Sequence, residues 1–494
     1  MVALLGMAGL VWAQDIQLPV QSHVLSNGLK VLVLERHEVP RIACRLAFRV
    51  GGSYDPQGRT GLAHLMEHMA FRGTKNIGTK DWPAEERVMA KIETLMAEII
   101  ALEGQGDAAS KARLAKLREQ LKQANERQKL LGKENELWEL YNTAGATGMN
   151  AYTSRDHTMY VVNVPANKLE LYMWLESDRV ANSVMRGFYT EREVVRDERR
   201  RSVDANPAGH YNEELNAVFY TAHPYRRPIV GWDSDLAKLT SADAAAFHST
   251  WYVPQNAVMC LVGDVKAAEA FKLAEQYFGR IPRSAKPLRV PPMDEPEQHG
   301  ERRVVAEVAS RPSVRIMFHA PKFLEADSYA MDVAAMVLNG DSGRLYRKLV
   351  VEKGVALSAG AYSDNSPTAG AFGLSAEPKP GRTHQEVEEA LVAEVEGLVT
   401  NPPTAQELAR ARNSYLADLV GGLESSDGLA DALATYECFG DWHHLLTEPK
   451  KSVAVTAEDV ARVIGKYLTV ENRTVGWLKE KPAESRAPQG GDAQ

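Results

Sequence analysis

The hydrophobic pattern of the first half of the chain alternates between strand-like runs and helix-like spacings. Short apolar runs rich in β-branched residues lie next to turns that contain Gly or Pro, as is typical of buried strands. These runs predict strands at 29–34, 42–50, 151–164 and 257–262. Between them, the spacing of apolar residues predicts helices that begin near Leu62, occupy 167–179 and 189–205, and end at Phe278.

The second half repeats this alternation after a proline-rich stretch. Residues 282–302 hold several prolines and few apolar side chains, which is typical of a linker. Strand and helix alternation on both sides of the linker indicates two α+β domains of similar size, over 15–281 and 303–480. In the second domain we expect strands at 313–318, 355–362 and 371–376, helices at 328–338 and 343–352, and long helices to Leu468.

A different pattern interrupts the first half at 83–140. Its apolar residues recur every three or four positions, for example at Val88, Ile92 and Leu95, and a glycine-containing break at 104–107 divides it. This pattern predicts an inserted helical hairpin. None of its residues looks catalytic, so the expected role is structural or partner-binding.

The length and composition are those of a globular protein with more than one domain. A chain of 494 residues exceeds the size of one hydrophobic core, and 44% hydrophobic with 25% charged residues is ordinary for a globular protein. A formal charge of −7 gives no indication of nucleic-acid binding. Three cysteines, far apart in the sequence, form neither a disulfide framework nor a cysteine-rich metal site.

The two ends of the chain differ from its body. Residues 1–14 are almost wholly apolar and resemble a signal peptide, which predicts export, in a bacterium to the periplasm; the alternative is an apolar segment that packs on the body. The run is too short to span a bilayer, and no later segment approaches that length, so we expect no membrane span in the mature chain. Residues 481–494 are expected to be disordered.

An H-x-x-E-H motif lies on the helix predicted after the glycine-rich turn. His64 and His68 are four residues apart and share a helical face, so both imidazoles can bind one Zn²⁺. Glu67 lies near that face and can reach a metal-bound water without binding the metal. The alternative is two surface histidines beside a carboxylate.

A catalytic zinc site needs a third protein ligand. Glu191 and Glu198 lie two helical turns apart on a later helix and share a face, so one can bind the metal while the other supports it. The alternative for this charged stretch is a solvated helix face.

The residues around these motifs resemble the M16 metallopeptidases. The segment GLAHLMEHMAFRGT (61–74) is similar to the zinc motif of that family, and NAYTSRDHTMY (150–160) to its Asn-Ala-x-Thr strand. HPYRRPIVG (223–231) and LVGDV (261–265) also match, and SGRLYRKLVVEKGVALSAGAY (342–362) resembles the inactive repeat. The resemblance implies two homologous α/β-roll domains, each a mixed or antiparallel sheet packed by helices.

The resemblance also implies a role for each candidate residue. The implied ligands of one zinc ion per chain are His64, His68 and Glu198. Glu67 would be the general base and Glu191 a supporting catalytic carboxylate. Asn150 and Ala151 would lie on an edge strand that pairs with an extended peptide substrate. The implied activity is that of a zinc endopeptidase that hydrolyses peptides or small unfolded polypeptides inside a closed chamber.

Two departures from the family pattern bear on partners. The 83–140 insertion lengthens the separation between His68 and Glu198. In the second half, Val350 and Leu357 stand where active members carry an Arg and a Tyr, and neither side chain can hydrogen-bond an oxyanion. Because the chain also has about half the length of single-chain members, we expect a heterodimer with a homologous subunit that lacks H-x-x-E-H and supplies that pair. The alternative is a homodimer, with the substitute drawn from Tyr346, Arg344 and Arg347.

Other interpretations fit the sequence less well. The glycines of 73–80 have the spacing of a phosphate-binding loop without its Lys and Ser/Thr order, and 340–343 falls short of a serine nucleophile elbow. The remaining alternative function is a non-catalytic scaffold or core-complex subunit that retains the M16 fold. Loss of metal ligands is its usual sign, and here every ligand position is present.

Overall fold

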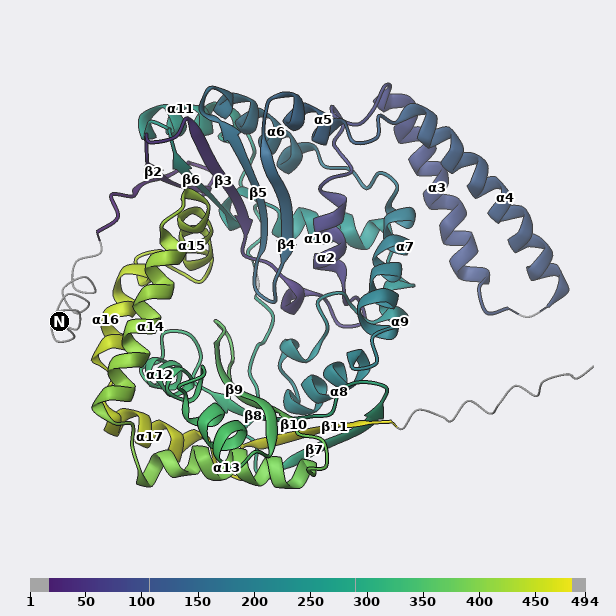
Figure 1. The fold of residues 1–494 in the computed structure, drawn as a ribbon. Coiled ribbons are helices and arrows are strands. Elements are labelled where there is room, and N and C mark those ends of the chain that lie inside the picture. Colours follow the sequence, from purple (N-terminus) through teal and green to yellow (C-terminus); the bar gives the residue numbers. More distant parts are fainter. Residues whose placement is uncertain (1–16, 106, 289, 482–494) are drawn as a thin grey trace, which may run out of the picture.

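The protein contains two mixed β-sheets packed by helices (Figure 1). The computed structural model describes residues 17–105, 107–288 and 290–481, so the predictions for 1–14 and, apart from Lys481, for 481–494 lie outside the described residues. The first sheet comprises β1 (Gln21–Val24), β2 (Lys30–Glu35), β3 (Arg41–Phe48), β4 (Thr147–Thr153), β5 (Thr158–Pro165) and β6 (Ala257–Gly263). The second comprises β7 (Arg302–Val308), β8 (Ser313–Ala320), β9 (Ala356–Asn365), β10 (Gly370–Pro378) and β11 (Arg473–Glu480).

The two sheets share one topology. The strand order is β1-β2-β6-β3-β5-β4 in the first sheet and β7-β11-β8-β10-β9 in the second. Apart from β1, each sheet pairs its first strand in parallel with its last, and all other neighbours are antiparallel. The predicted α+β class with two homologous halves is therefore confirmed. The middle strand of each half, β4 or β9, lies at a sheet edge.

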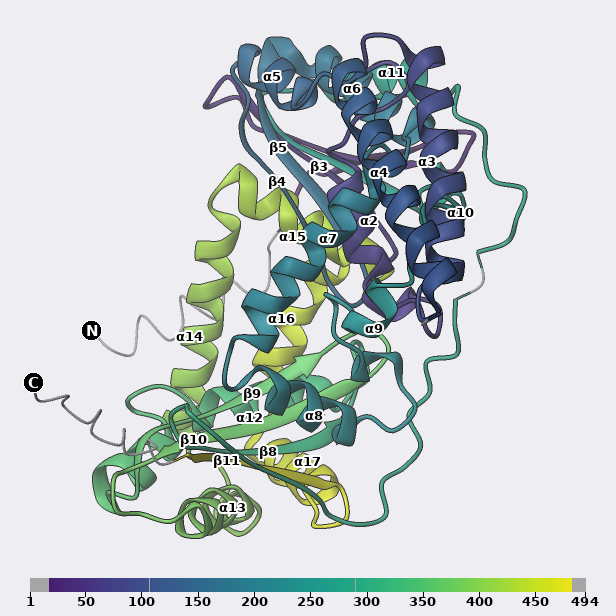
Figure 2. The ribbon, with the colours of Figure 1, turned by 90° about the vertical axis from the view of Figure 1, so that its right-hand side faces the viewer.

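Helices surround both sheets (Figure 2). Those of the first half are α2 (Leu62–Met69), α3 (Trp82–Leu102), α4 (Ala108–Leu131), α5 (Glu136–Thr143), α6 (Leu169–Asn182), α7 (Phe188–Arg199), α8 (Gly209–Phe219), α9 (Asp233–Leu236), α10 (Ser241–Trp251) and α11 (Ala267–Tyr277). Those of the second half are α12 (Ser328–Leu338), α13 (His384–Thr400), α14 (Ala405–Leu423), α15 (Ser426–Cys438), α16 (His444–Ala454) and α17 (Ala457–Tyr467). π-Helical turns occupy Arg200–Asp204 and Tyr346–Glu352.

The first sheet is covered on both faces, but from distant parts of the chain. Successive residues of β2 point to opposite sides: Val31 packs in the core shared with α2, α6 and α11, and Leu32 packs in the core shared with α15. Figure 1 shows that α15, although it belongs to the second half, lies against the first sheet. The predicted domain division at 282–302 gives no indication of this crossing.

Several elements differ from the sequence predictions, among them the helix expected at 343–352, of which Tyr346–Glu352 is π-helical. The strand expected at 151–164 is a hairpin of β4 and β5, because the Ser154 hydroxyl accepts a hydrogen bond from the His157 N–H and closes a turn. The helix expected at 189–205 is α7 followed by the π-helical turn. The inserted hairpin ends at Leu131, since Gly132 leaves the helical conformation, and α5 packs with the body through Leu137 and Tyr141.

The α3–α4 hairpin projects from the side of the first half (Figures 1 and 2). Ile92, Leu95 and Leu117 form a small core between its two helices, separate from the core of the body. At its base, Arg186 of the body makes a two-point ion pair with Glu85 of α3, with N–O distances of 2.6 and 3.0 Å. The hairpin is therefore fixed to the body and carries its own apolar packing.

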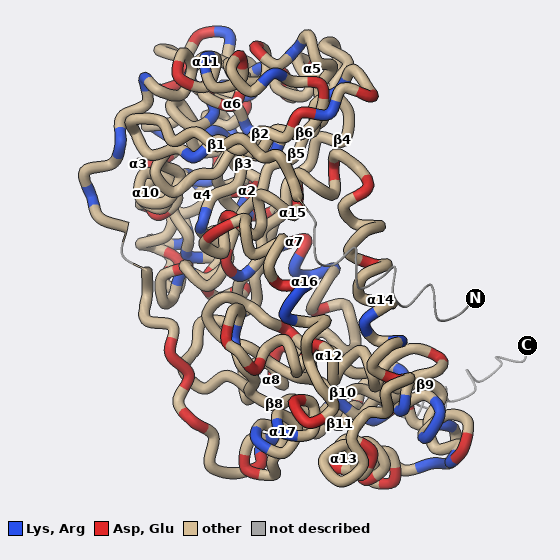
Figure 3. Tube along the Cα trace, turned by 90° about the vertical axis from the view of Figure 1, so that its left-hand side faces the viewer, with Lys and Arg blue, Asp and Glu red and all other residues tan. Residues whose placement is uncertain are grey.

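Charge is spread over the whole molecule. Figure 3 shows acidic and basic residues interspersed along both halves, in keeping with the formal charge of −7. Within the described ranges, no helix has both the length and the apolar character needed to cross a bilayer.

Candidate metal centre

The first turn of α2 is held in place by Asp55. Its carboxylate accepts hydrogen bonds from the N–H groups of Gly61 and Ala63, at 2.7 and 2.8 Å. Burial raises the pKa of Asp55 to about 7, against the effect of these bonds. Gly61 has φ 85°, and a Cβ there would lie 2.6 Å from the Val230 carbonyl oxygen, so only glycine fits. These contacts set the position from which α2 presents its motif.

Helix α2 directs two histidines at one carboxylate of α7. His64 Nε2 lies 3.7 Å from Glu198 Oε1, and His68 Nε2 lies 3.5 Å from Glu198 Oε2. The three ligand atoms all lie within 4.8 Å of one another. A single cation placed among them can reach all three. The structure thus brings together the residues that the sequence names as metal ligands.

The second carboxylate of α7 holds His68 from behind. His68 Nδ1 lies 3.0 Å from Glu191 Oε1 and donates to it, which leaves Nε2 facing Glu198. Glu191 Oε2 in turn lies 3.6 Å from Nε of Arg72. Such a carboxylate fixes the tautomer and the ring orientation of a metal-binding histidine. Glu191 therefore lies behind His68, whereas Glu198 faces both histidines.

The donor set fits zinc. Two imidazoles and one carboxylate are the ligands of many catalytic zinc sites, and they leave a fourth position for water. The remaining nitrogen of His64, Nδ1, is buried and has no hydrogen-bond partner among the described residues. Its ring is therefore held by packing rather than by a second acceptor.

Electrostatics favour a positive charge at this point. Burial opposes protonation of His68, but its hydrogen bonds to Glu191 and Glu198 outweigh burial and raise the pKa of His68 to about 9. The bond to His68 lowers the pKa of Glu198 below its ordinary value. Burial, aided by the charge of His68, lowers the pKa of His64 to about 4. The two carboxylates thus stabilise one cation, while His64 stays neutral and able to bind a metal.

Glu67 lies beside the ligand group and is held by a strand. The hydroxyl of Thr153, on β4, donates a 2.6 Å hydrogen bond to Glu67 Oε2. Burial raises the pKa of Glu67 above its ordinary value, and the Thr153 bond partly offsets this. Thr153 was not among the predicted site residues. Its only signal was its place in the Asn-Ala-x-Thr segment.

Strand β4 offers a free edge beside α2. Ala151 is buried and pairs in register with Tyr160 of β5, whereas Asn150 is exposed. The other side of β4 has no partner strand among the described residues. An exposed edge next to a metal centre is suited to pairing with an extended peptide.

The two positions of the missing Arg–Tyr pair and its possible substitutes all lie in the second half. Leu357, on the edge strand β9, is half exposed, and Val350 packs partly against the second core. Arg344 is buried and makes two 2.8 Å hydrogen bonds to the Glu407 carboxylate, so it is committed to the fold. Of the substitutes considered for a homodimer, Tyr346 and Arg347 remain.

Two family models match this chain. One, described as insulinase (peptidase family M16), matches residues 30–93 and 131–233, and the other, described as the peptidase M16 inactive domain, matches residues 238–415. The chain belongs to peptidase family M16. The first model breaks at 94–130, within the α3–α4 hairpin, so most of the hairpin lies outside the family pattern.

Relatives and solved structures extend this match over most of the chain. A zinc protease, PqqE, from Helicobacter pylori is 25% identical over 93% of this M16 chain and 92% of the relative. The crystal structure of a protease from Helicobacter pylori covers 94% of this chain and 100% of its own, with a TM-score of 0.78 and 25% identity. The first half of the periplasmic protease PqqL from Escherichia coli shares the fold, with a TM-score of 0.68 and 16% identity, over 93% of this chain and 92% of its own.

Proposed function

We propose that this M16 chain is a zinc-dependent endopeptidase that hydrolyses peptides or small unfolded polypeptides inside a closed chamber. The observation that carries the proposal is the convergence of His64, His68 and Glu198 from two helices. A non-catalytic scaffold has no need of Glu67 held at 2.6 Å by Thr153 beside a complete ligand set.

Each side chain of the centre has a place in the proposed reaction. His64, His68 and Glu198 would hold the zinc ion, and Glu191 would keep His68 oriented. Zinc bound there would supply Lewis acidity toward the scissile carbonyl and an acidified water. Glu67, beside the ligand group, would act as the general base that accepts a proton from the attacking water and returns it to the leaving amine. Burial raises the pKa of Glu67 above its ordinary value, which makes its carboxylate a stronger base for this role.

Strand β4 supports the choice of substrate. An extended peptide paired with the free edge at Asn150 and Ala151 is recognised through its backbone N–H and C=O groups. This mode depends little on side chains and suits unfolded peptides.

A heterodimer and export are part of the proposal. Val350 and Leu357 cannot hydrogen-bond an oxyanion, and Arg344 is held by Glu407, so a homologous subunit without H-x-x-E-H is proposed to supply an Arg and a Tyr. The apolar residues 1–14 and the periplasmic location of Escherichia coli PqqL support export to a bacterial periplasm.

The test of the chemistry is Glu67→Gln. The variant should retain one zinc per chain by elemental analysis, while peptide hydrolysis by the complex purified from the native source falls by a factor of about 10² or more, as expected for loss of a general base. Glu193→Gln on α7, at a half-exposed side chain, is the control and should keep both zinc and activity. Hydrolysis by Glu67→Gln at the parent rate would contradict the mechanism, and absence of zinc from the parent would favour the scaffold alternative.

The test of the partner is purification from the native source followed by mass spectrometry. We expect a homologous M16 subunit to co-purify, and the isolated chain to be weakly active until that subunit is added. Full activity of the isolated chain would contradict the heterodimer and direct attention to Tyr346 and Arg347 in a homodimer.

A further inference from the structure

The two halves of the molecule have an equivalent edge strand beside an equivalent helix. In chain order and in strand order, α12 and β9 of the second half are the counterparts of α2 and β4 of the first. An edge strand leaves a row of N–H and C=O groups with which another extended chain can pair. The molecule therefore has two equivalent edges at which an extended peptide could be added.

In the second half, a side chain occupies this edge. Asn339 follows the last residue of α12, and its Nδ2 donates a 2.5 Å hydrogen bond to the carbonyl oxygen of Ala361 on β9. Its Oδ1 accepts a 2.7 Å hydrogen bond from the Ala361 N–H. In an antiparallel ladder the N–H and C=O groups of one residue point to the same side. Asn339 therefore takes both backbone groups that an added strand would use at Ala361.

The amide of Asn339 fits closely against β9. An asparagine side chain carries a donor and an acceptor on a flat amide, as the peptide group of a neighbouring strand does. A Cβ at Gly360 would lie 3.2 Å from Asn339 Oδ1, so glycine at this position leaves room for the amide. Ala361 is only 9% exposed, so water competes little for the two hydrogen bonds. The edge of β9 is thus closed near its middle.

Strand β9 would otherwise be well suited to strand addition. It runs from Ala356 to Asn365, and Leu357 and Tyr362 expose 49% and 44% of their surface. A long edge strand with exposed apolar side chains is the kind with which other extended chains pair. With Ala361 occupied, only short stretches of β9 stay free on either side. The two hydrogen bonds of Asn339 therefore block an edge that would be open without them.

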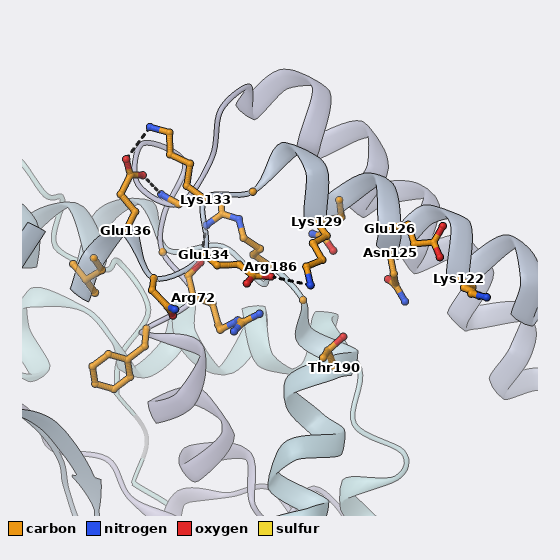
Figure 4. A pocket seen from close by; sticks show the side chains of 18 of the residues that line it. Arg72, Lys122, Asn125, Glu126, Lys129, Lys133, Glu134, Glu136, Arg186 and Thr190 are labelled. Carbon is orange, nitrogen blue, oxygen red and sulfur yellow. Dashed lines mark hydrogen bonds and ion pairs between the residues drawn. The ribbon is translucent and has the colours of Figure 1, made fainter. Parts of the chain in front are cut away.

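The first half differs at the equivalent place. The segment after α2 turns toward the inserted hairpin, where the Arg72 carbonyl oxygen accepts a 2.6 Å hydrogen bond from Arg186 Nη1. Figure 4 shows the side chains of both arginines beside the cavity between α4 and the start of α7. Within the part of the chain that the structure describes, no side chain hydrogen-bonds the backbone of residues 150–153 on β4. The edge beside the metal centre is therefore open, whereas its counterpart is closed.

We propose that Asn339 is a specificity-determining residue that closes β9 against extended peptides, so that a peptide pairs with β4 and not with the equivalent edge of the second half. Strand β9 belongs to the other sheet, so a peptide held there would not be paired beside the metal centre. The inference rests on the proposed function in taking the ligand to be an extended peptide, but it concerns where the peptide binds and not its hydrolysis.

The test is hydrogen–deuterium exchange with mass spectrometry on the full Glu67→Gln chain and on Glu67→Gln/Asn339→Ala, each with and without peptide. The probe is a short peptide of alternating Val and Thr, with Lys at each end and with acetylated and amidated termini. It should slow exchange at 150–153 in both chains, and at 358–364 only where Asn339 is replaced, by about fivefold, the factor expected for one hydrogen bond. The same peptide with Pro at alternate positions, which lacks those N–H donors, should slow neither segment.

Asn401→Ala is the matched control, because Asn401 follows α13 as Asn339 follows α12 but is exposed. In this control the probe should leave exchange at 358–364 unchanged. Asn339→Asp is a second variant, in case the alanine variant does not fold. It keeps an acceptor for the Ala361 N–H and frees the Ala361 carbonyl, so the probe should slow exchange at 358–364 to a smaller extent.

Two results would overturn the proposal. One is exchange at 358–364 that the probe does not slow in either Asn339 variant, which would make Asn339 a brace for β9 alone. The other is slowing of this segment by the probe in the Glu67→Gln chain that retains Asn339. Absence of any effect at 150–153 would instead count against the peptide position in the proposed function, so the two failures are distinguishable.

Discussion

Two motif side chains of the centre, His68 and Glu67, are each held by a residue that the H-x-x-E-H motif does not contain. Glu191 holds His68, Arg72 lies next to Glu191, and Thr153 holds Glu67. The motif residues come from one helix, whereas the residues that hold them come from α7, β4 and the segment after α2. The centre therefore depends on how these elements pack as well as on the motif.

Thr153→Val should impair the reaction without removing the metal. The change deletes the 2.6 Å hydrogen bond that orients Glu67 and favours its ionised form. Loss of one hydrogen bond to a charged group, about 1.5 kcal/mol, corresponds to a decrease in kcat of about tenfold, with KM and zinc content unchanged. Steady-state kinetics and elemental analysis of the complex measure this. Thr153→Ser should restore the rate, and a Ser variant as slow as Val would show that the methyl group, and not the hydroxyl, matters.

At this scale the sequence could indicate which residues lie together but not what holds them. Spacing alone places His64 and His68 on one face, and the resemblance selects Glu198 as their companion. Thr153 could not be selected by spacing, because its contact with Glu67 joins a strand and a helix that are far apart in the sequence. Arg72 next to Glu191 is a contact of the same kind.

Among the elements, α15 is the one whose position is least determined by its neighbours in the sequence. It follows helices of the second half and yet packs on β3 and β6 of the first sheet. Its Glu437 is only 2% exposed and accepts hydrogen bonds from Lys30 of β2 and from Arg49, which follows β3, at 2.8 and 3.0 Å. Charged pairing therefore fixes an apolar contact between the two halves.

Glu437→Gln should weaken this docking. The change leaves Lys30 and Arg49 without their carboxylate and should lower the free energy of unfolding by about 2 kcal/mol, as expected for a buried charge-assisted pair. Urea unfolding measures the effect. Asp418→Asn, at an exposed position of the neighbouring α14, is the control. If both variants were as stable as the parent, the ion pairs would contribute nothing to docking.

Most strands and helices could be predicted from apolar periodicity, and their exceptions have a physical reason. The short edge strand β1 and the strands β7 and β11 were not predicted. Every second residue of β7 is shielded but only Val304 is fully buried, and β7 pairs with β11 across almost the whole second half, so its apolar pattern is weak. Nothing local indicates which sheet an amphipathic helix such as α15 will cover.

At the scale of the whole molecule, histidines shielded from water make the stability of the fold depend on pH. His223 and His319 lie where the two halves meet, and the His319 ring stacks on Phe219 with centroids 4.1 Å apart. Burial lowers the pKa of both histidines from 6.5 to about 4. Between these values the unfolded chain binds protons that the folded chain does not. Stability contributed by these neutral rings is therefore lost as the pH falls from 6.5 toward 4.

His319→Phe tests this dependence. Phenylalanine keeps the stack on Phe219 and removes one of the two histidines that take up a proton on unfolding. The Tm of the variant should therefore fall less than that of the parent between pH 7 and pH 5. Thermal unfolding followed by circular dichroism measures both. His299→Phe, at an exposed position, is the control. Comparison with the parent cancels the contribution of Asp55, whose raised pKa acts in the opposite direction. Equal Tm changes in parent and variant would contradict the linkage.

The position of α15 also bears on the order in which the chain completes its fold during synthesis. One face of the first sheet finds its covering helices early, but Leu32, Cys260 and Val262 on the other face must wait for Leu429 and Leu433. Until those residues leave the ribosome, a wide apolar surface stays open to water and to other nascent chains. The first half is therefore the part most in need of a chaperone, and that need lasts until α15 of the second half has been made.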